Sequence, residues 1–434
     1  MMKLRRSFQQ LPELFRQYLL VTTNYWCFTL TDGALRMLVV LYFYQLGYGA
    51  LDIALLFVFY EFFGVVTNLI GGWLGARIGL NRTMNIGLFT QIVALAMLLV
   101  PAAELTVVWV MTAQALSGIA KDLNKMSAKS AVKSLANFSF NDSNSSASTT
   151  YDRASEARLF KLVAVLTGSK NTLKGVGFFL GGALLALFGF QGAVLIMLIL
   201  LCLILILSVL RLKHDLGKAK NKPKFKQIFS KSRAINVLSA ARLFLFCARD
   251  VWFVVALPVY LASEFGWQHE WVGGFLATWV IIYGLVQSNA PKLIKRFSAK
   301  AINASHKEAK MAFFWGLILT LITAFITLGL LFQVSAFWVL MIGLAAFAIA
   351  FAINSSLHSF LIVHYASEEG VSLDVGFYYM ANALGRLIGT LLSGYLYQAY
   401  GLEACIGFSV VLLLTASTIA IALPSQTESS IETS

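Results

Sequence analysis

The chain has 434 residues, of which 59% are hydrophobic and only 12% are charged, and its mean hydropathy is +0.76. These values exclude an ordinary soluble domain and indicate a polytopic membrane protein. The formal net charge of +14 does not indicate a nucleic-acid partner. The excess charge lies beside the apolar stretches, where anionic membrane lipid is the nearest partner.

Apolar stretches of membrane length recur along the whole chain, and about 20 residues suffice for one crossing. Twelve transmembrane helices are predicted, at residues 18–43, 51–71, 84–103, 106–124, 160–188, 192–211, 236–261, 271–290, 312–331, 335–360, 374–399 and 403–423. We therefore expect an all-α polytopic membrane protein with its twelve transmembrane helices in two six-helix halves.

Polar segments between these stretches predict how the chain is divided. A basic, proline-containing linker at 212–235 separates an N-terminal half, 1–211, from a C-terminal half, 236–424, and a polar tail follows at 425–434. Within the first half, residues 137–157 have the composition of a disordered insert.

The lysines and arginines of the short connections lie on one alternating set of them. The connections after the odd-numbered stretches contain none, whereas Arg77, Arg82, Lys292 and Lys295 lie on the opposite set. Because positively charged short loops stay on the cytoplasmic side, we expect a multi-pass protein with both termini in the cytoplasm.

The two halves resemble each other in sequence. Moving the fifth stretch onto the eleventh by 212 positions pairs Lys174 with Arg386, Gly177 with Gly389, Gly182 with Gly394 and Gly189 with Gly401. Parallel repeats of this kind are typical of transporters.

Ionisable residues are confined to particular apolar stretches. Apart from Arg211 and Glu403 at their ends, the third, sixth, ninth and twelfth have none, and the others carry Asp32, Arg36, Glu61, Lys121, Asp122, Lys125, Lys170, Lys174, Arg242, Arg249, Asp250, His358 and Arg386. Such a residue costs roughly 3 kcal/mol at membrane depth unless it faces a cavity or a partner. Every third helix is therefore expected to face lipid, and the remainder to surround a cavity.

Cations outnumber acids at this depth by eight to four. An unpaired buried charge is unfavourable until a counter-charge arrives, which predicts a small-molecule anionic substrate. The candidate substrate-binding residues are Arg36, Lys121, Lys170, Lys174, Arg242, Arg249, Arg386, Asn171 and Asn382. The alternative is that these groups only brace helices: Asp32 and Arg36 could pair with each other, and Lys125 could extend to the headgroups.

Three acidic residues, Asp32, Glu61 and Asp250, are candidates for proton coupling, because an intramembrane carboxylate can bind and release a proton. Structural hydrogen bonding is the alternative. The four cysteines form no CxxC or Cys/His group, so neither a metal site nor a cofactor is expected. No phosphate-binding loop of the ATPase type occurs, so a gradient would have to drive transport.

The segment GGWLGARIGLNR at 71–82 resembles the signature loop of the major facilitator superfamily. The matching positions, with the basic residue that closes the loop, are Gly72, Leu74, Arg77, Gly79 and Arg82. The resemblance implies that this loop takes part in conformational change. Ala76 stands where the family usually has aspartate, which puts the usual charge latch of this loop in doubt.

More narrowly, SGIAKDLNKMSAKSAVK at 117–133, TGSKNTLKGVGFFLGG at 167–182 and SKSRAINVLSAARLFLFCARDVWFVVALPVYL at 230–261 resemble the organoarsenical efflux permeases of bacterial arsenic-resistance operons. The resemblance implies export of 1-arseno-3-phosphoglycerate across a bacterial inner membrane by alternating access, giving arsenate resistance. It also implies dependence on glyceraldehyde-3-phosphate dehydrogenase, which makes this ester from arsenate. We expect a monomer.

Two other functions are consistent with parts of this pattern. A major facilitator transporter of another organic anion, such as a sugar phosphate or a dicarboxylate, would need the same surplus of cations. A membrane-embedded enzyme is not expected, because His358 and His364 are too sparse for a catalytic group near one membrane face.

Overall fold

The computed structural model describes residues 13–47, 56–101, 104–138, 148–212, 232–267, 269–298, 307–367 and 371–424. Within these ranges the chain is helical and has no β-strand, which confirms the predicted all-α class. The helices in chain order are α2 Glu13–Gln45, α4 Val58–Ile78, α5 Leu80–Met97, α6 Val107–Phe138, α7 Ser148–Arg211, α8 Arg233–Phe253, α9 Ala256–Ser263, α10 His269–Ser298, α11 Lys307–Leu331, α12 Ala336–Tyr365 and α13 Val371–Ile421.

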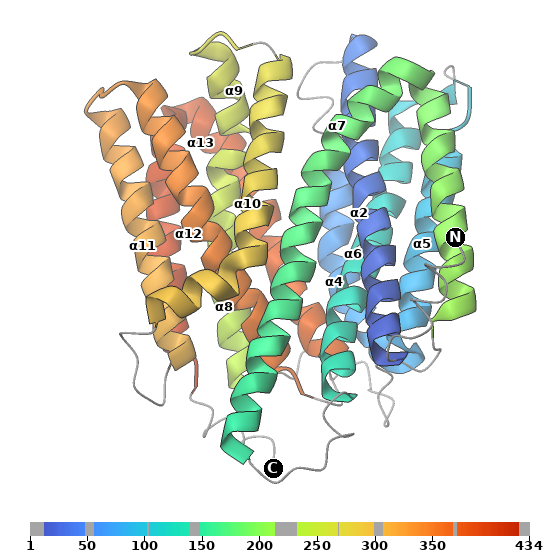
Figure 1. Cartoon of the computed structure of the whole chain (residues 1–434). Coiled ribbons are helices and arrows are strands. Elements are labelled where there is room, and N and C mark those ends of the chain that lie inside the picture. Colours follow the sequence, from blue (N-terminus) through green and yellow to red (C-terminus); the bar gives the residue numbers. More distant parts are fainter. Residues whose placement is uncertain are drawn as a thin grey trace. The chain divides into compact units, whose positions relative to one another are not determined.

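Two of these helices each contain two predicted crossings joined by a reversal. α7 breaks at Gly189 (φ 67°, ψ −178°), and α13 breaks at Gly401 (φ 81°, ψ −176°). Glycine is essentially the only residue that adopts this backbone conformation without strain. Figure 1 shows α7 rising, turning over and descending. Both glycines that the sequence repeat aligns are therefore reversal points.

Eight helical segments of the described chain are long and apolar enough to cross a membrane. Two of them, Leu159–Arg211 and Val371–Ile421, contain the reversals. α5 and α6 add two helices, with 18 and 32 residues. The described helices are thus consistent with twelve transmembrane helices.

Some predicted boundaries differ from the observed ones. α4 continues to Ile78 instead of ending near residue 71, because Gly71, Gly72 and Gly75 are buried in helix contacts and remain helical. The predicted stretch 236–261 is divided between α8 and α9.

The polar segments are only partly described. Residues 148–157 of the predicted insert belong to the first turns of α7. The centre of that insert, 139–147, lies outside the described residues, as do most of the linker, 213–231, and the tail, 425–434. The division into two halves remains a prediction.

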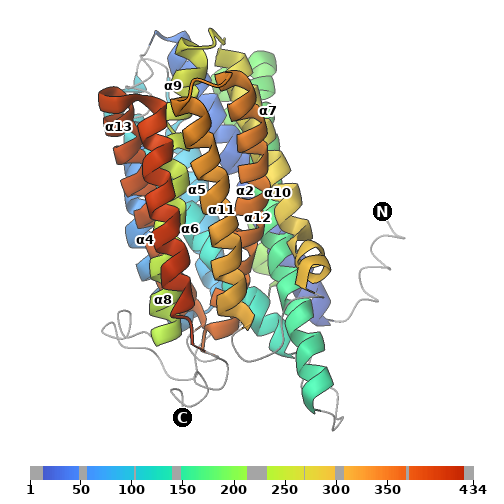
Figure 2. The ribbon, with the colours of Figure 1, turned by 90° about the vertical axis from the view of Figure 1, so that its left-hand side faces the viewer.

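By packing, the chain forms two compact units. Unit 1 comprises residues 1–166, 176–228 and 366–376; unit 2 comprises 167–175, 229–365 and 377–434. The core of unit 1 lies between α2, α5, α6 and both limbs of α7, with Leu56 just before α4. In unit 2, α11 packs on α12, and Gly316 of α11 contacts Ser417 on the second limb of α13. Figure 2 shows α11, α12 and α13 running alongside one another.

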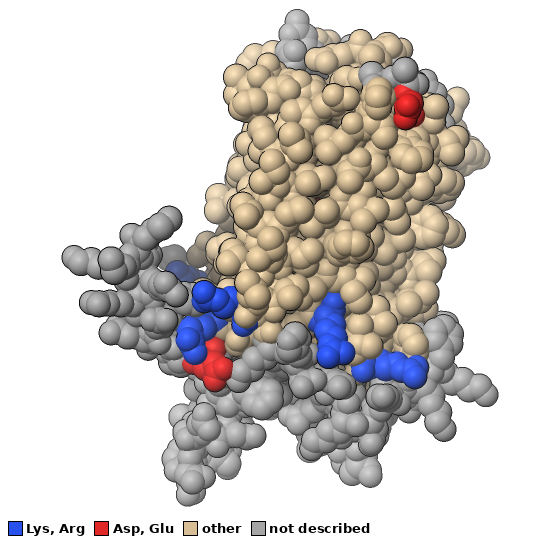
Figure 3. Space-filling model, turned by 90° about the vertical axis from the view of Figure 1, so that its right-hand side faces the viewer, with Lys and Arg blue, Asp and Glu red and all other residues tan. Residues whose placement is uncertain are grey.

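Charge is unevenly distributed over the surface. On the face in Figure 3, lysine and arginine side chains gather at one end, beside a broad band without charge. Exposed cations of unit 1 include Arg77, Arg82, Lys161 and Arg211. Large apolar side chains of the same unit, such as Phe89 and Leu203, are more than half exposed. An exposed apolar surface of this kind fits lipid contact.

Candidate functional site

In unit 1, the buried ring of Tyr60 on α4 lies at the centre of a charge cluster. Its hydroxyl donates to Asp32 Oδ1 of α2 at 2.7 Å. Arg36 Cζ of α2 and Lys121 Nζ of α6 lie 4.7 and 3.7 Å from the centroid of the ring. Arg36 Nη2 also donates to Glu61 Oε1 at 3.0 Å. The tyrosine thus joins two cations and one carboxylate from three helices.

A second carboxylate pairs the cations of α6. Asp122 Oδ2 lies 3.7 Å from Lys121 Nζ, and Asp122 also accepts a hydrogen bond from Lys125. Glycines allow this approach of α4 and α6: a Cβ on Gly118 would lie 2.5 Å from the carbonyl oxygen of Tyr60, and one on Gly64 would lie 2.7 Å from Asp122 Oδ2.

Among the described residues, the contacts of the unit 1 charge cluster join three cations and three acids, namely Arg36, Lys121, Lys125, Asp32, Glu61 and Asp122. Asp32 of α2 contacts Tyr60 of α4, and Arg36 of α2 contacts Glu61 of α4. Lys125 contacts Asp122 and is only 10% exposed, so it does not extend to the headgroups.

In unit 2, a single carboxylate serves two arginines. Asp250 of α8 accepts from Arg249 Nε through Oδ1 at 2.6 Å and from Arg386 Nε of α13 through Oδ2 at 3.2 Å. Asp250 is buried, whereas the arginine side chains are 15% and 24% exposed. A Cβ on Gly389 would lie 2.8 Å from the carbonyl oxygen of Cys247, so this glycine lets α13 approach α8 closely enough for the contact.

A third arginine of unit 2 has only neutral hydrogen-bond partners. Arg242 Nε donates to Asn382 Oδ1 at 2.9 Å, and Nη1 donates to Ser355 Oγ at 3.0 Å and to its carbonyl oxygen at 3.3 Å. Its guanidinium lies 4.0 Å from the centroid of the Phe246 ring. Arg242 is 3% exposed and has no acidic partner among the described residues. We call Arg242, Arg249, Asp250 and Arg386 the arginine cluster.

Asn171 is linked to Arg242 through hydrogen bonds of Gln287 and Ser355. It donates to Gln287 Oε1 at 2.6 Å, and Gln287 Nε2 donates to Ser355 Oγ at 3.4 Å, the same hydroxyl that Arg242 contacts. Lys170 and Lys174, on the same segment of α7, are half-buried and both have interaction partners. Unit 2 therefore brings together Asn171, Arg242, Arg249, Asp250, Asn382 and Arg386 of the predicted site residues.

Sequence reasoning missed the neutral members of both clusters. Tyr60, Gln287, Ser355 and Phe246 carry no charge, and buried polar or aromatic residues in membrane helices usually serve packing. One signal was available: Arg242, Phe246 and Arg249 follow an i, i+4, i+7 spacing and so share one face of α8.

The signature loop forms a tight junction without its usual acidic residue. Gly79 (φ 97°) joins α4 to α5, and its N–H donates to the carbonyl of Gly75 at 3.0 Å. Arg77 lies 5.1 Å above the Trp73 ring. A Cβ on Gly72 would lie 2.5 Å from the carbonyl oxygen of Ser372. Arg82 is exposed on α5.

The position of the missing aspartate is apolar in this chain. Ala76 packs with Leu373 of α13, and Leu69 and Trp73 pack against the same contact. The junction between α4 and the start of α13 therefore rests on apolar packing at this point instead of on a carboxylate.

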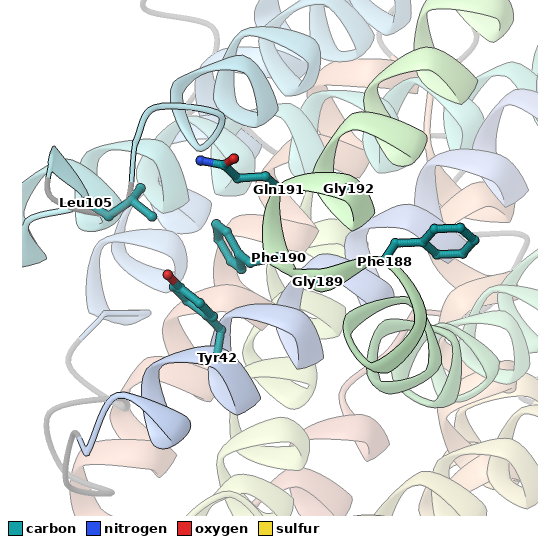
Figure 4. A pocket seen from close by; sticks show the side chains of 7 residues that line it. All are labelled: Tyr42, Leu105, Phe188, Gly189, Phe190, Gln191 and Gly192. Atoms are coloured by element: carbon teal, nitrogen blue, oxygen red, sulfur yellow. The ribbon is translucent and has the colours of Figure 1, made fainter.

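A surface pocket of unit 1 shares no lining residue with the unit 1 charge cluster or the arginine cluster. It is lined by Tyr42, Leu105 and the reversal of α7 from Phe188 to Gly192. Figure 4 shows Tyr42 beside Phe190, with Phe188 directed away. None of its lining residues is charged, so it offers no counter-charge for an anion.

Comparison with known proteins identifies the family. The family model described as Major Facilitator Superfamily matches residues 21–306 of this chain. No curated protein matches the sequence.

Solved structures of transporters share the fold. The human organic anion transporter MFSD10 (TETRAN) is similar over 94% of this chain and 100% of its own, with 16% identity and a TM-score of 0.70. The E. coli fucose:proton symporter FucP is similar over 94% and 99%, with 13% identity and a TM-score of 0.66. A bacterial homologue of the iron transporter ferroportin, in an outward-facing state, is similar over 94% and 98%, with 13% identity and a TM-score of 0.68.

These matches indicate a transporter and not an enzyme. The chain belongs to the major facilitator superfamily.

Proposed function

We propose that this protein is a secondary transporter that exports an organic oxyanion, 1-arseno-3-phosphoglycerate, from the bacterial cytoplasm by alternating access. The observation that carries the proposal is the arginine cluster, in which three arginines have one carboxylate. Uncompensated charge in a low-dielectric site favours binding of a counter-charge. Arginine also presents paired N–H groups that fit carboxylate, phosphate and arsenate oxygens.

The unit 1 charge cluster and the arginine cluster have different proposed roles. In the described contacts of the unit 1 charge cluster three acids accompany three cations, so we expect this cluster to attract an anion less than the arginine cluster does. We assign anion binding to Arg242, Arg249 and Arg386, with Asn382 and Asn171 supporting them. Asp32 and Glu61 are the proposed proton-coupling groups, and Asp250 is the shared counter-ion of the two arginines.

Energetics and one structural relative support export of an anion. Moving an anion out of a negative-inside cell gains about 2.3 kcal/mol per charge per 100 mV. The human relative with the same fold is described as an organic anion transporter.

Arsenate tolerance tests the proposal directly. Arsenate-sensitive bacteria should gain tolerance when they produce this chain together with glyceraldehyde-3-phosphate dehydrogenase, and should gain none when either is missing. The Arg249→Gln variant should lose the gain, and Lys161→Gln, which alters an exposed cation away from the cluster, should keep it. No gain with the intact pair would refute export of the arsenylated ester.

Everted vesicles separate the remaining alternatives. The ester, generated in the assay by the dehydrogenase, should accumulate inside vesicles that contain the protein, and a pH gradient should raise its uptake if Asp32 or Glu61 couples protons. Uptake of a sugar phosphate or dicarboxylate without uptake of the ester would instead establish the alternative cargo.

A further inference from the structure

Two cations of α8 lie against the same aromatic ring. Arg242, Phe246 and Arg249 follow one another by about one turn along one helix face. The guanidinium carbons lie 4.0 and 4.7 Å from the centroid of the Phe246 ring, so they are less than about 9 Å apart. Phe246 is about one turn from each arginine, and both guanidiniums contact its ring.

Both arginines keep N–H groups that no described residue accepts. Arg242 donates through Nε and Nη1 but not through Nη2. Arg249 donates through Nε alone, which leaves the fork of its two Nη groups. None of these Nη groups is among the buried atoms that lack a partner, so they are accessible to a ligand or to water.

The surroundings at the two ends differ. The guanidinium of Arg249 lies among the rings of Phe246, Phe253 and Phe351, at 4.7, 5.8 and 5.5 Å from their centroids. Arg249 also shares Asp250 with the partly exposed Arg386.

The Arg242 end is more enclosed and is polar. Its guanidinium lies 5.3 Å from the Tyr378 ring. His358 of α12 is 2% exposed, lies about one turn from Ser355, which Arg242 contacts, and has no hydrogen-bond partner for Nδ1 within the described chain. An incompletely bonded histidine beside an arginine without an acidic partner is a second sign that a ligand group belongs there.

We infer that unit 2 binds a molecule with two anionic ends, one held by Arg242 with His358 and the other by Arg249 with Arg386, and that Phe246 sets the distance between them. The inference rests on the proposed function and narrows its substrate class. A single tetrahedral oxyanion that contacts both arginines is the alternative that the test must exclude. Two ends joined by a few bonds match a separation below about 9 Å.

Binding of synthetic phosphonates to the purified full-length protein tests this inference. The probes are ethylphosphonate, with one anionic group, and bisphosphonates whose two groups are joined by two, three, four or six methylenes. Affinity is obtained from the dependence of the melting temperature on probe concentration. The best bisphosphonate should bind wild type roughly ten-fold or more tightly than ethylphosphonate, since a second charge-assisted contact is gained.

The linker series and two variants locate the second contact. Affinity should pass through a maximum with linker length and fall at six methylenes. Arg242→Gln should reduce the preference for the bisphosphonate to near unity while leaving ethylphosphonate affinity within about two-fold, because one end remains. Lys161→Gln should retain the full preference. If Arg242→Gln does not fold, the wild-type linker series decides alone.

The outcomes distinguish this inference from the function on which it rests. Equal affinity of wild type for one-ended and two-ended probes, or a preference that Arg242→Gln retains, would overturn the two-ended site and leave anion transport standing. No binding of any phosphonate, together with no uptake of the arsenylated ester, would instead overturn the proposed function.

Discussion

At the scale of single residues, Asp250 is the carboxylate that two arginines of unit 2 share. Its two oxygens accept from Arg249 and Arg386, which lie on different helices. Removing one arginine leaves the carboxylate paired with the other. Removing the carboxylate leaves two guanidiniums without their shared counter-ion.

This asymmetry predicts unequal effects on stability. Asp250→Asn should destabilise the protein by about 3–5 kcal/mol, the usual cost of breaking a buried ion pair from one side. Arg249→Gln should cost clearly less, because Arg386 still neutralises Asp250. Melting temperatures of the purified variants in one detergent check the order. An Arg249→Gln variant as unstable as Asp250→Asn would contradict the shared role.

At the scale of helices, glycines decide where the charged faces meet. Gly177 of α7 fits against Leu30 and Ala34 of α2, and Gly389 of α13 fits against Cys247 and Asp250 of α8. These two glycines are aligned by the sequence repeat. The same close approach therefore recurs in both units, and in unit 2 it brings Arg386 to Asp250.

A pair of substitutions on α13 tests this packing. Gly389→Leu should lower stability by about 1–3 kcal/mol or more through overpacking, because a Cβ there would already lie 2.8 Å from a carbonyl oxygen of α8. Gly394→Leu is the matched control on the same helix, since a Cβ at Gly394 would meet nothing within 4 Å in the described structure. Thermal unfolding of both variants should separate them. Equal losses would show that the approach of α8 and α13 does not depend on Gly389.

At the scale of the whole molecule, the charge pattern predicts orientation in the membrane. Exposed Glu104 lies in a connection without lysine or arginine, whereas exposed Arg82 lies on the opposite, basic set. Short basic connections remain in the cytoplasm.

Cysteine labelling in intact cells checks this orientation. In a background with Cys27, Cys202, Cys247 and Cys405 replaced, a membrane-impermeant maleimide should label Glu104→Cys from outside. Arg82→Cys should react only after the cells are permeabilised. Labelling of Arg82→Cys in intact cells would reverse the proposed topology.

The sequence alone determined the all-α class, the approximate positions of the membrane helices and the confinement of charge to particular helices. These properties depend on composition over about 20 residues and on the cost of charge in lipid, so no tertiary contact is needed to predict them. Even the reversals at Gly189 and Gly401 appear as aligned glycines in the repeat.

Only the tertiary structure decided which charges compensate each other. Asp32 contacts Tyr60, 28 positions away, and Asp250 contacts Arg386, 136 positions away. Neither partner follows from helical periodicity, because each depends on which faces of two separate helices pack together. Counting charges in the sequence predicted a surplus of cations. Only the packed helices show where the cations lie. In the described residues of unit 1 three cations accompany three acids, and in those of unit 2 three arginines surround one carboxylate.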